Sequence, residues 1–188
     1  MKIINIHAGS WLSNCYVLIS VDSHGKSHAA VIDPSAPADD VISTLAEHGA
    51  TLDMIIMTHG HFDHIMSLDS LREKTNATVC IHKADAEMLC DGKKNAYSFF
   101  FGASFEQGEA DRLLADGEIL TLGDETLKVM HLPGHSKGSV CLLCGDFMVT
   151  GDTLFANGFG RYDLHGGNVN QLADSIASLR ALDRKLTI

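Results

Sequence analysis

Apolar positions along the chain recur at two spacings, one typical of short strands and the other of amphipathic helices. In the first third, runs rich in Val and Ile are separated by Gly, Ser, Asn and Asp, which predicts strands over residues 3–7, 15–21 and 29–33. Pro37 then opens a helix at a position where its missing N–H costs nothing, and Gly49 ends that helix. The predicted buried face of this helix consists of Val41, Ile42, Leu45 and Ala46.

The rest of the chain alternates between the two spacings and then returns to strands. The stretch over residues 53–57, apolar from Met54 onward, predicts a buried strand, and a helix follows with Ile65, Leu68 and Leu71 on one face. Strands are also predicted over residues 78–81, 119–122, 126–132, 140–144 and 147–149, and helices over 84–90 and 169–182. The last helix is expected to bury Leu172, Ile176 and Leu179, and residues 185–188 have the character of one more strand.

Residues 91–112 are the least regular part of the chain, and they contain the aromatic run Tyr97-Ser98-Phe99-Phe100-Phe101. Two interpretations of this run stay open. The aromatic side chains either cap the hydrophobic core beneath a loop or form an apolar wall over a functional site.

The composition is that of a soluble globular enzyme with a single domain, 1-188. Apolar residues make up 45% of the chain, enough to bury a substantial core. The net charge of -10, without a Lys/Arg cluster, argues against nucleic acid and anionic membranes, so we expect a small-molecule substrate as the partner. No stretch approaches the roughly 20 apolar residues that span a bilayer, and residues 1–7 lack the apolar core of a signal peptide, which predicts a cytoplasmic location.

The five cysteines are odd in number and irregular in spacing, which predicts reduced thiols rather than a disulfide framework. Cys141 and Cys144 match a CxxC pattern, but they lie in a strand-like run. Because successive side chains of a strand point to opposite faces, residues three apart diverge and cannot share a metal ion. The pair is therefore interpreted as strand thiols.

The run Thr58-His59-Gly60-His61-Phe62-Asp63-His64 places three imidazoles and a carboxylate directly after an apolar strand. These ligand types suit zinc, iron or manganese, and four of them are too many for one ion that keeps an open position. The spacing therefore indicates two metal ions, one bound by His59 and His61 and the other by Asp63 and His64. The alternative, a polar turn with incidental histidines, is disfavoured because residues that can bind a metal ion follow two later strand-like segments as well.

The recurrences are His135 and Asp152. His135 lies between Pro133-Gly134 and Gly138, in a rigid turn that can fix an imidazole. Asp152 follows an apolar strand, and the two oxygens of its carboxylate can reach both metal ions. Asp152 is accordingly the natural bridging ligand, although each of the two residues alone could be a turn histidine or a helix-capping aspartate.

Taken together, these residues resemble a known family. His59-x-His61-x-Asp63-His64, Pro133-Gly134-His135 and Gly151-Asp152 are similar to the successive signatures of the metallo-β-lactamase superfamily. The resemblance extends to Asn14-Cys15-Tyr16 and to Gly160-Arg161-Tyr162-Asp163-Leu164, and it is strongest to the compact bacterial hydroxyacylglutathione hydrolases (glyoxalase II). It implies an α/β (α+β) fold, a four-layer αββα sandwich with the metal ions at one edge between the sheets.

The resemblance also implies roles for the individual residues. His59, His61 and His135 would bind the first metal ion, Asp63 and His64 the second, and Asp152 would bridge the two; zinc is expected first, with iron or manganese as alternatives. The family supplies one more histidine to the second ion from a loop after a strand that would follow Ile188. His165 does not match it, because it precedes the last helix. We therefore expect the domain to be truncated before its last strand and last ligand loop.

Departures from the family pattern narrow the range of activities that the resemblance implies. Zinc β-lactamases usually carry Cys at the position of Asp152, which argues against hydrolysis of β-lactam antibiotics, and flavodiiron proteins carry Glu at that of Gly60. Nuclease branches add insertions too long for 188 residues. Arg161 and Asp163 are interpreted as a structural ion pair rather than a substrate clamp.

Three hypotheses about function remain. The first is hydrolysis of thioesters of the S-2-hydroxyacylglutathione type by a metal-bound hydroxide, with Asp63 and Asp152 as catalytic residues. The second is an iron-dependent persulfide (sulfur) dioxygenase that uses His59, His135 and Asp152. The third is a metal-binding remnant without catalysis, which the intact ligand set disfavours. The substrate itself and the oligomeric state are left open by the sequence.

Overall fold

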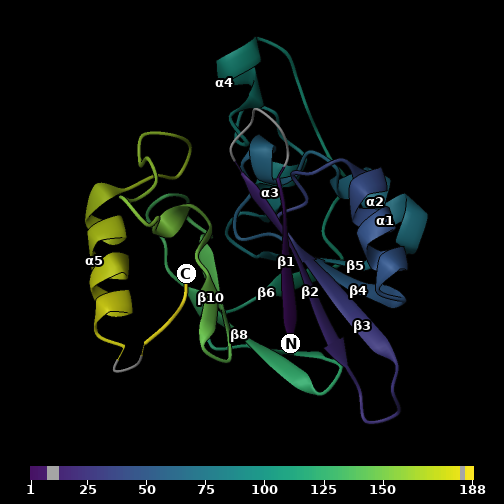
Figure 1. The fold of residues 1–188 in the computed structure, drawn as a ribbon. Coiled ribbons are helices and arrows are strands. Elements are labelled where there is room, and N and C mark those ends of the chain that lie inside the picture. The colour runs from purple at the N-terminus through teal and green to yellow at the C-terminus, as the bar shows by residue number, and fades with distance from the viewer. Residues whose placement is uncertain (8–12, 183–184) are drawn as a thin grey trace.

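The computed structural model describes residues 1–7, 13–182 and 185–188, and its strands form two sheets (Figure 1). The first sheet has the order β1-β2-β3-β4-β5-β6. Its strands are β1 (Lys2–His7), β2 (Asn14–Val21), β3 (Ser27–Ile32), β4 (Ala50–Ile56), β5 (Thr78–His82) and β6 (Arg112–Leu114). The pairs β1–β2 and β2–β3 are antiparallel, whereas the pairs from β3 to β6 are parallel.

The second sheet has the order β10-β9-β8-β7 and is antiparallel throughout. Its strands are β7 (Ile119–Leu122), β8 (Glu125–His131), β9 (Val140–Cys144) and β10 (Phe147–Val149). Thr187 forms a parallel bridge with Phe147, and its carbonyl accepts a hydrogen bond of 2.8 Å from the Met148 N–H. The last described residues thus lie beside β10, which agrees with the strand character predicted for residues 185–188.

Helices cover the outer faces of both sheets. Helices α1 (Ala38–Glu47) and α2 (Leu68–Thr75) lie beyond the first sheet, and α5 (Val169–Arg180) lies beyond the second (Figure 1). Two shorter helices, α3 (Ala86–Leu89) and α4 (Tyr97–Phe101), and two 3-10 turns, η1 (Phe62–His64) and η2 (Gly151–Thr153), belong to loops. The side chain of Asn168 begins α5 by accepting hydrogen bonds from the N–H groups of Asn170 and Gln171, at 3.0 and 3.1 Å.

Buried apolar side chains form three separate clusters that correspond to three interfaces between layers. Val41 and Leu71 of the outer helices pack with Val31 and Ile55 of the first sheet. Between the sheets, the strands contribute Leu18, Ile32, Ile56, Val129 and Leu142. On the far side, Leu179 of α5 packs with Cys141 and Met148. Helices, sheet, sheet and helix therefore form the four-layer αββα sandwich, which confirms the predicted fold class.

The cysteines behave as the strand pattern requires. All five are unpaired thiols, and Cys144 belongs to the cluster between the sheets whereas Cys141 faces α5. Burial raises the pKa of both thiols to about 12, so they stay protonated and contribute as small apolar side chains. The two cysteines of the CxxC pattern therefore lie on opposite faces of the sheet, as strand geometry requires.

Several details differ from the prediction. The helix expected to include Ile65 begins only at Leu68, because residues 62–64 form the 3-10 turn η1 and Ile65 caps it. Ala46 is exposed rather than buried, since it lies on the outer side of α1. Strand β6 and helix α4 were not predicted, and α3 is shorter than the helix predicted over residues 84–90. Among the described residues, no helix combines the length and apolar character needed to cross a bilayer.

Candidate metal centre

The candidate metal centre lies where three parallel strands end. Asp33 follows β3, the histidine run of residues 58–64 follows β4, and Asp85 comes after β5. Because parallel strands present their carboxyl ends at one edge of a sheet, these loops are neighbours. The second sheet contributes His135 from the β8–β9 loop and Asp152 from η2, after β10. The site therefore lies at the common edge of the two sheets.

Three histidines converge at the first position. His61 Nδ1 lies 2.8 Å from His135 Nε2, which lies 3.1 Å from His59 Nε2. All three side chains are almost completely buried. Zn–N bonds of about 2.0–2.1 Å at tetrahedral angles separate neighbouring nitrogens by about 3.3 Å, close to the spacing found here. Burial lowers the pKa of His59 and His61 well below its ordinary value, so each keeps a lone pair free for a metal ion.

A second group of ligand types adjoins the first. His64 Nε2 lies 3.3 Å from Asp152 Oδ1 and 3.7 Å from Asp63 Oδ2. This nitrogen is buried and has no hydrogen-bond partner with acceptable geometry, although two carboxylates face it. A buried ring nitrogen directed at carboxylate oxygens without a hydrogen bond is the arrangement expected around a shared cation. The donor set thus fits a second divalent metal ion.

Asp152 faces both groups. Its Oδ1 is directed toward His64, and its Oδ2 lies 3.6 Å from His135 Nε2. Burial raises the pKa of Asp152, but His64 and His135 outweigh that effect and hold it at about 2. A carboxylate that remains ionised and directs one oxygen to each group can serve two ions.

Hydrogen bonds outside the cluster fix the orientation of the histidine rings. Asp33 is buried and accepts hydrogen bonds from the Thr58 N–H and hydroxyl, at 2.7 and 2.6 Å, while its Oδ2 lies 2.9 Å from His64 Nδ1. The Arg161 carbonyl lies 2.6 Å from His135 Nδ1. Partners of this kind select the tautomer and hold the metal-facing nitrogen in place.

Asp85 connects the two loops that supply the three histidines. Its Oδ2 accepts hydrogen bonds from the Gly60 N–H at 3.2 Å and the Ser136 hydroxyl at 2.5 Å, and its Oδ1 accepts from the Gly138 N–H at 2.6 Å. Gly138 is required by this close approach, because a Cβ there would lie 2.7 Å from Asp85 Cγ. We call this arrangement the Asp85 brace.

Helix α5 supports the second loop from outside. The Ser175 hydroxyl donates to the Pro133 carbonyl at 2.7 Å, and the Asn168 N–H donates to the Gly134 carbonyl at 2.8 Å. The Pro-Gly turn that carries His135 is therefore held against the end of the helix.

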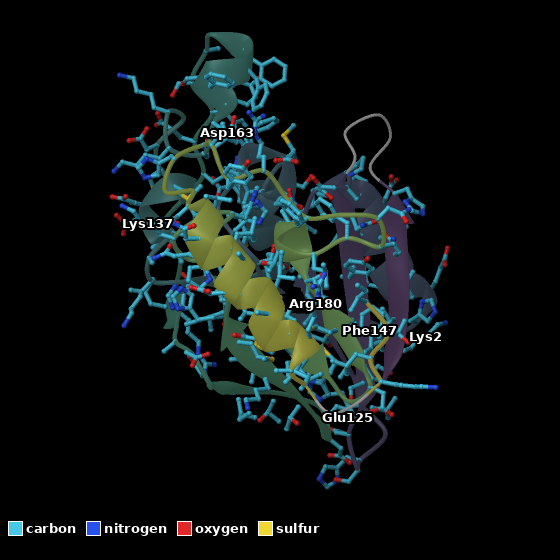
Figure 2. All side chains as sticks on the ribbon, turned by 90° about the vertical axis from the view of Figure 1, so that its left-hand side faces the viewer. Lys2, Glu125, Lys137, Phe147, Asp163 and Arg180 are labelled. Carbon is cyan, nitrogen blue, oxygen red and sulfur yellow. The ribbon has the colours of Figure 1, made fainter. Side chains whose placement is uncertain are left out.

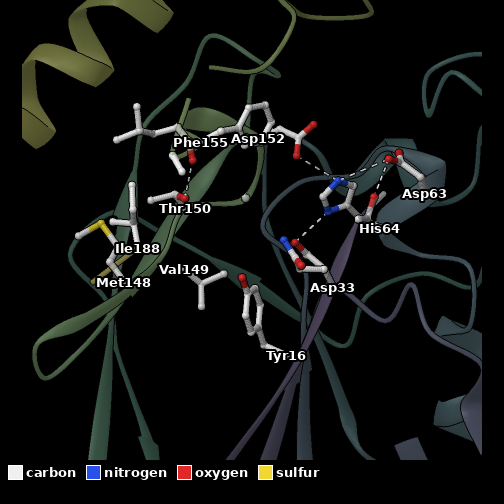
Figure 3. A pocket seen from close by; sticks show the side chains of 15 residues that line it. Tyr16, Asp33, Asp63, His64, Met148, Val149, Thr150, Asp152, Phe155 and Ile188 are labelled. Atoms are coloured by element: carbon white, nitrogen blue, oxygen red, sulfur yellow. Dashed lines mark hydrogen bonds and ion pairs between the residues drawn. The ribbon is translucent and has the colours of Figure 1, made fainter. Parts of the chain in front are cut away.

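A cavity of about 450 Å³ opens beside the second group (Figure 3). In Figure 3, Asp33, Asp63 and His64 lie on one side and Asp152, Thr150 and Phe155 on the other. Tyr16 and Val149 lie deeper between the sheets. The cavity thus has a polar end at the candidate ligands and an apolar remainder.

All six residues predicted as ligands are together in this centre: His59, His61, Asp63, His64, His135 and Asp152. Arg161 and Asp163 form the expected ion pair, with Nε–Oδ1 and Nη2–Oδ2 distances of 2.7 and 2.9 Å. Asp33 and Asp85 were missed, because neither belongs to a spaced motif. Their signal in the sequence is weak: each is an acidic residue shortly after a predicted strand.

Comparisons with known proteins agree with this geometry. The sequence model described as "Metallo-beta-lactamase superfamily" matches residues 8–188. The chain is 36% identical to a probable metallo-hydrolase, YqgX, of Bacillus subtilis over 94% of its own length and 82% of that protein's.

Solved structures are also similar. The BLEG-1 B3 metallo-β-lactamase is 34% identical, with a TM-score of 0.85 over 94% of this chain and 84% of that one. TTHA1623 in a di-iron-bound form is 28% identical, with a TM-score of 0.80 over 95% of this chain and 86% of that one. Because one of these similar structures is a metallo-β-lactamase, the expectation that this chain does not hydrolyse β-lactams stays a prediction.

Proposed function

Because the chain belongs to the metallo-β-lactamase superfamily, we propose that this metallo-hydrolase cleaves thioesters of the S-2-hydroxyacylglutathione type. Two divalent metal ions, zinc first among the candidates, would assist the reaction. The single observation that carries the proposal is the pair of adjoining ligand groups that share Asp152, one with three histidines and one with His64 and Asp63.

His59, His61 and His135 would hold the first ion, Asp63 and His64 the second, and Asp152 both. Ions bound there would act as Lewis acids and lower the pKa of a coordinated water toward neutrality. The neutral imidazoles of His59 and His61 suit this role, and the low pKa of Asp152 keeps its carboxylate ionised.

The contribution of the protein's own side chains is to orient the attacking water and to exclude other positions for that water. Asp63 Oδ2 accepts a hydrogen bond of 2.7 Å from the Ser13 hydroxyl, so its carboxylate is fixed in the wall of the cavity. In this position Asp63 can accept a hydrogen bond from the water that attacks the thioester carbonyl. The leaving thiolate has a modest pKa and needs no dedicated proton donor.

The direct test is turnover of S-lactoylglutathione by protein loaded with zinc, with the metal content measured on the same sample. Nitrocefin in a parallel assay reports β-lactam hydrolysis. Cleavage of the thioester at a rate far above that of nitrocefin supports the proposal, and the reverse order contradicts it. Loss of activity on chelation and its return with zinc would separate the metal centre from a contaminant.

A second candidate activity is oxidation of a persulfide by dioxygen, with one iron held by His59, His135 and Asp152. The convergence of these three residues favours it, and the similar TTHA1623 structure contains iron, although two ions of it. Iron-loaded protein supplied with glutathione persulfide would then consume oxygen. The paired Asp63 and His64 favour hydrolysis, because a single iron ion does not require them.

A further inference from the structure

Two histidines outside the metal centre form a stacked pair. His82 ends β5 in the first sheet and His131 ends β8 in the second, and their rings lie nearly parallel at 14°, with centroids 4.0 Å apart. Each follows by two positions an apolar residue of the cluster between the sheets, Cys80 in β5 and Val129 in β8. Because alternate residues of a strand share a face, both rings lie between the sheets. The pair ends that interface on the side where both strands lead into the loops of the metal centre.

Hydrogen bonds link the pair to the two turns that the Asp85 brace also joins. The His82 carbonyl accepts a hydrogen bond of 2.9 Å from the Asp85 N–H. Because a carbonyl can only accept, His131 Nε2 donates to the Lys137 carbonyl, at 2.9 Å. The next residue, Gly138, donates its N–H to Asp85 Oδ1 at 2.6 Å. The stacked rings thus form a second connection, beside the brace, between the turn after β5 and the β8–β9 loop.

The His82 ring is held in its neutral form. His82 is 3% exposed, and its Nδ1 accepts a hydrogen bond of 3.3 Å from the Ala84 N–H. The proton of the neutral ring is accordingly on Nε2, and a second proton on Nδ1 would point at the Ala84 hydrogen. Burial lowers the pKa of His82 to about 4, with smaller contributions from His131 and Lys83. Asp116 acts on this pKa in the opposite direction.

Exposed charged residues surround the pair. Lys83 directly follows His82, and Asp116 accepts a hydrogen bond of 2.9 Å from the His131 N–H. Lys137 contacts the pair through its carbonyl, whereas the stem of its side chain lies against the loop that leads into α5 (Figure 2). Because the charges of Lys83 and Asp116 oppose each other and are screened by water, a cation at His82 gains little from its surroundings.

We propose that His82 and His131 form a pH-sensitive clamp on the turn that carries His135. The clamp is closed while His82 is neutral. A proton that binds to His82 Nδ1 displaces the Ala84 N–H and moves the charged ring toward water. The stack then separates, and the hydrogen bond from His131 to the Lys137 carbonyl loses the ring that covers it. Both histidines are positioning residues, because they act on the metal ligand through the turn, and the clamp does not rest on the proposed thioesterase function.

The direction of the pH effect follows from the two states of His82. The pKa of about 6.5 of an unperturbed histidine describes the opened clamp, whereas the pKa is about 4 in the closed one. The opened state therefore binds more protons, so the clamp is fully stable above pH about 6.5 and loses stability as the pH falls toward about 4. From pH 7 to pH 5 the ratio of opened to closed clamp should rise about twentyfold.

Amide hydrogen exchange of Gly138 in the full chain measures the clamp, because this N–H is released when the turn moves. After correction for the intrinsic effect of pH, we expect this exchange to accelerate about twentyfold from pH 7 to pH 5 in metal-free protein. His82→Phe keeps a ring that can stack but cannot take up a proton, so it should lose this acceleration. His24→Phe is the matched control, because His24 is an exposed histidine between β2 and β3. Zinc release from the loaded proteins to a chelator should be accelerated less by acid in His82→Phe than in the other two proteins.

The comparison between variants separates the clamp from other titrating groups. Burial raises the pKa of Asp85, the acceptor of the Gly138 N–H, but that effect is common to all three proteins. Equal acceleration of the exchange in wild type and His82→Phe would overturn the clamp. If thermal melting shows that His82→Phe does not fold, the ring signals of His82 in wild-type protein decide by NMR. Signals of a neutral ring down to pH about 5 support the clamp, and a titration centred near pH about 6.5 overturns it.

Discussion

Removal of the Asp85 carboxylate should weaken the tri-histidine site without any change in its ligands. Asp85 accepts hydrogen bonds from Gly60, between His59 and His61, and from Ser136 and Gly138, which follow His135. In Asp85→Ala these buried donors lose their acceptor, and the two loops lose the one carboxylate that accepts hydrogen bonds from both of them. The relative positions of the three imidazoles then depend on the remaining contacts, such as the hydrogen bonds of Thr58 with Asp33 and of the His135 turn with α5.

The size of the effect follows from the number of donors left without a partner. An unsatisfied buried donor costs about 1–3 kcal/mol, and water entering the space would recover part of that. We therefore expect Asp85→Ala to lower the free energy of unfolding of the metal-free protein by about 3–5 kcal/mol. Loss of a residue that orients ligands typically weakens metal binding by about 10–100-fold. Asp85→Asn keeps one acceptor oxygen, so its unfolding free energy and its metal affinity should lie between those of wild type and of Asp85→Ala.

The assay is competition for zinc against a chromogenic chelator, together with urea unfolding of the metal-free proteins. The matched control is Asp69→Ala, because Asp69 also accepts a backbone hydrogen bond, from Gly108, but lies on α2. The control should lose stability and keep its zinc affinity. Zinc affinity equal to wild type in a folded Asp85→Ala protein would refute the brace as a determinant of the metal site.

Two further predictions concern other charged groups. Asp152→Ala should remove metal from both positions, whereas His64→Ala should mainly empty the second; equal losses by elemental analysis after dialysis would contradict the bridging role. Hydrogen bonds with Asp53 and Asp22 raise the pKa of His28 in the folded protein. The contribution of protonated His28 to the free energy of unfolding is therefore complete below pH about 6.5, the pKa of an unperturbed histidine, and it is lost as the pH rises through the raised pKa of the folded protein. The difference in unfolding free energy between wild type and His28→Gln should accordingly shrink with rising pH, and a constant difference would count against this interpretation.

The sequence predicted most of the fold because its signals are local. The Val- and Ile-rich run of residues 15–21 and the helical face of Leu172 and Leu179 are visible in short windows, and both elements formed. Strand β6 has three residues and exists through its parallel pairing with β5, which no local pattern encodes. For the same reason the sequence could not predict α4, whose aromatic side chains depend on Phe62 for their position.

The candidate ligands could be predicted as well, because metal chemistry restricts both residue type and spacing. His59, His61 and His64 lie in one run, His135 and Asp152 each come shortly after a predicted strand, and the resemblance to a family assigned their roles. Asp33 and Asp85 act through other residues, so their role depends on which loops the fold brings together. Asp85 lies 51 residues before its partner Ser136.

The most direct test of the central claim is an oxygen-electrode measurement on zinc-loaded protein during turnover of S-lactoylglutathione, repeated in anaerobic buffer. Hydrolysis uses Lewis acidity and requires neither oxygen nor a change in metal oxidation state. The account predicts equal thioester cleavage with and without oxygen, and no oxygen uptake. Stoichiometric oxygen uptake with glutathione persulfide by the iron form, together with no thioester cleavage by either metal form, would contradict it.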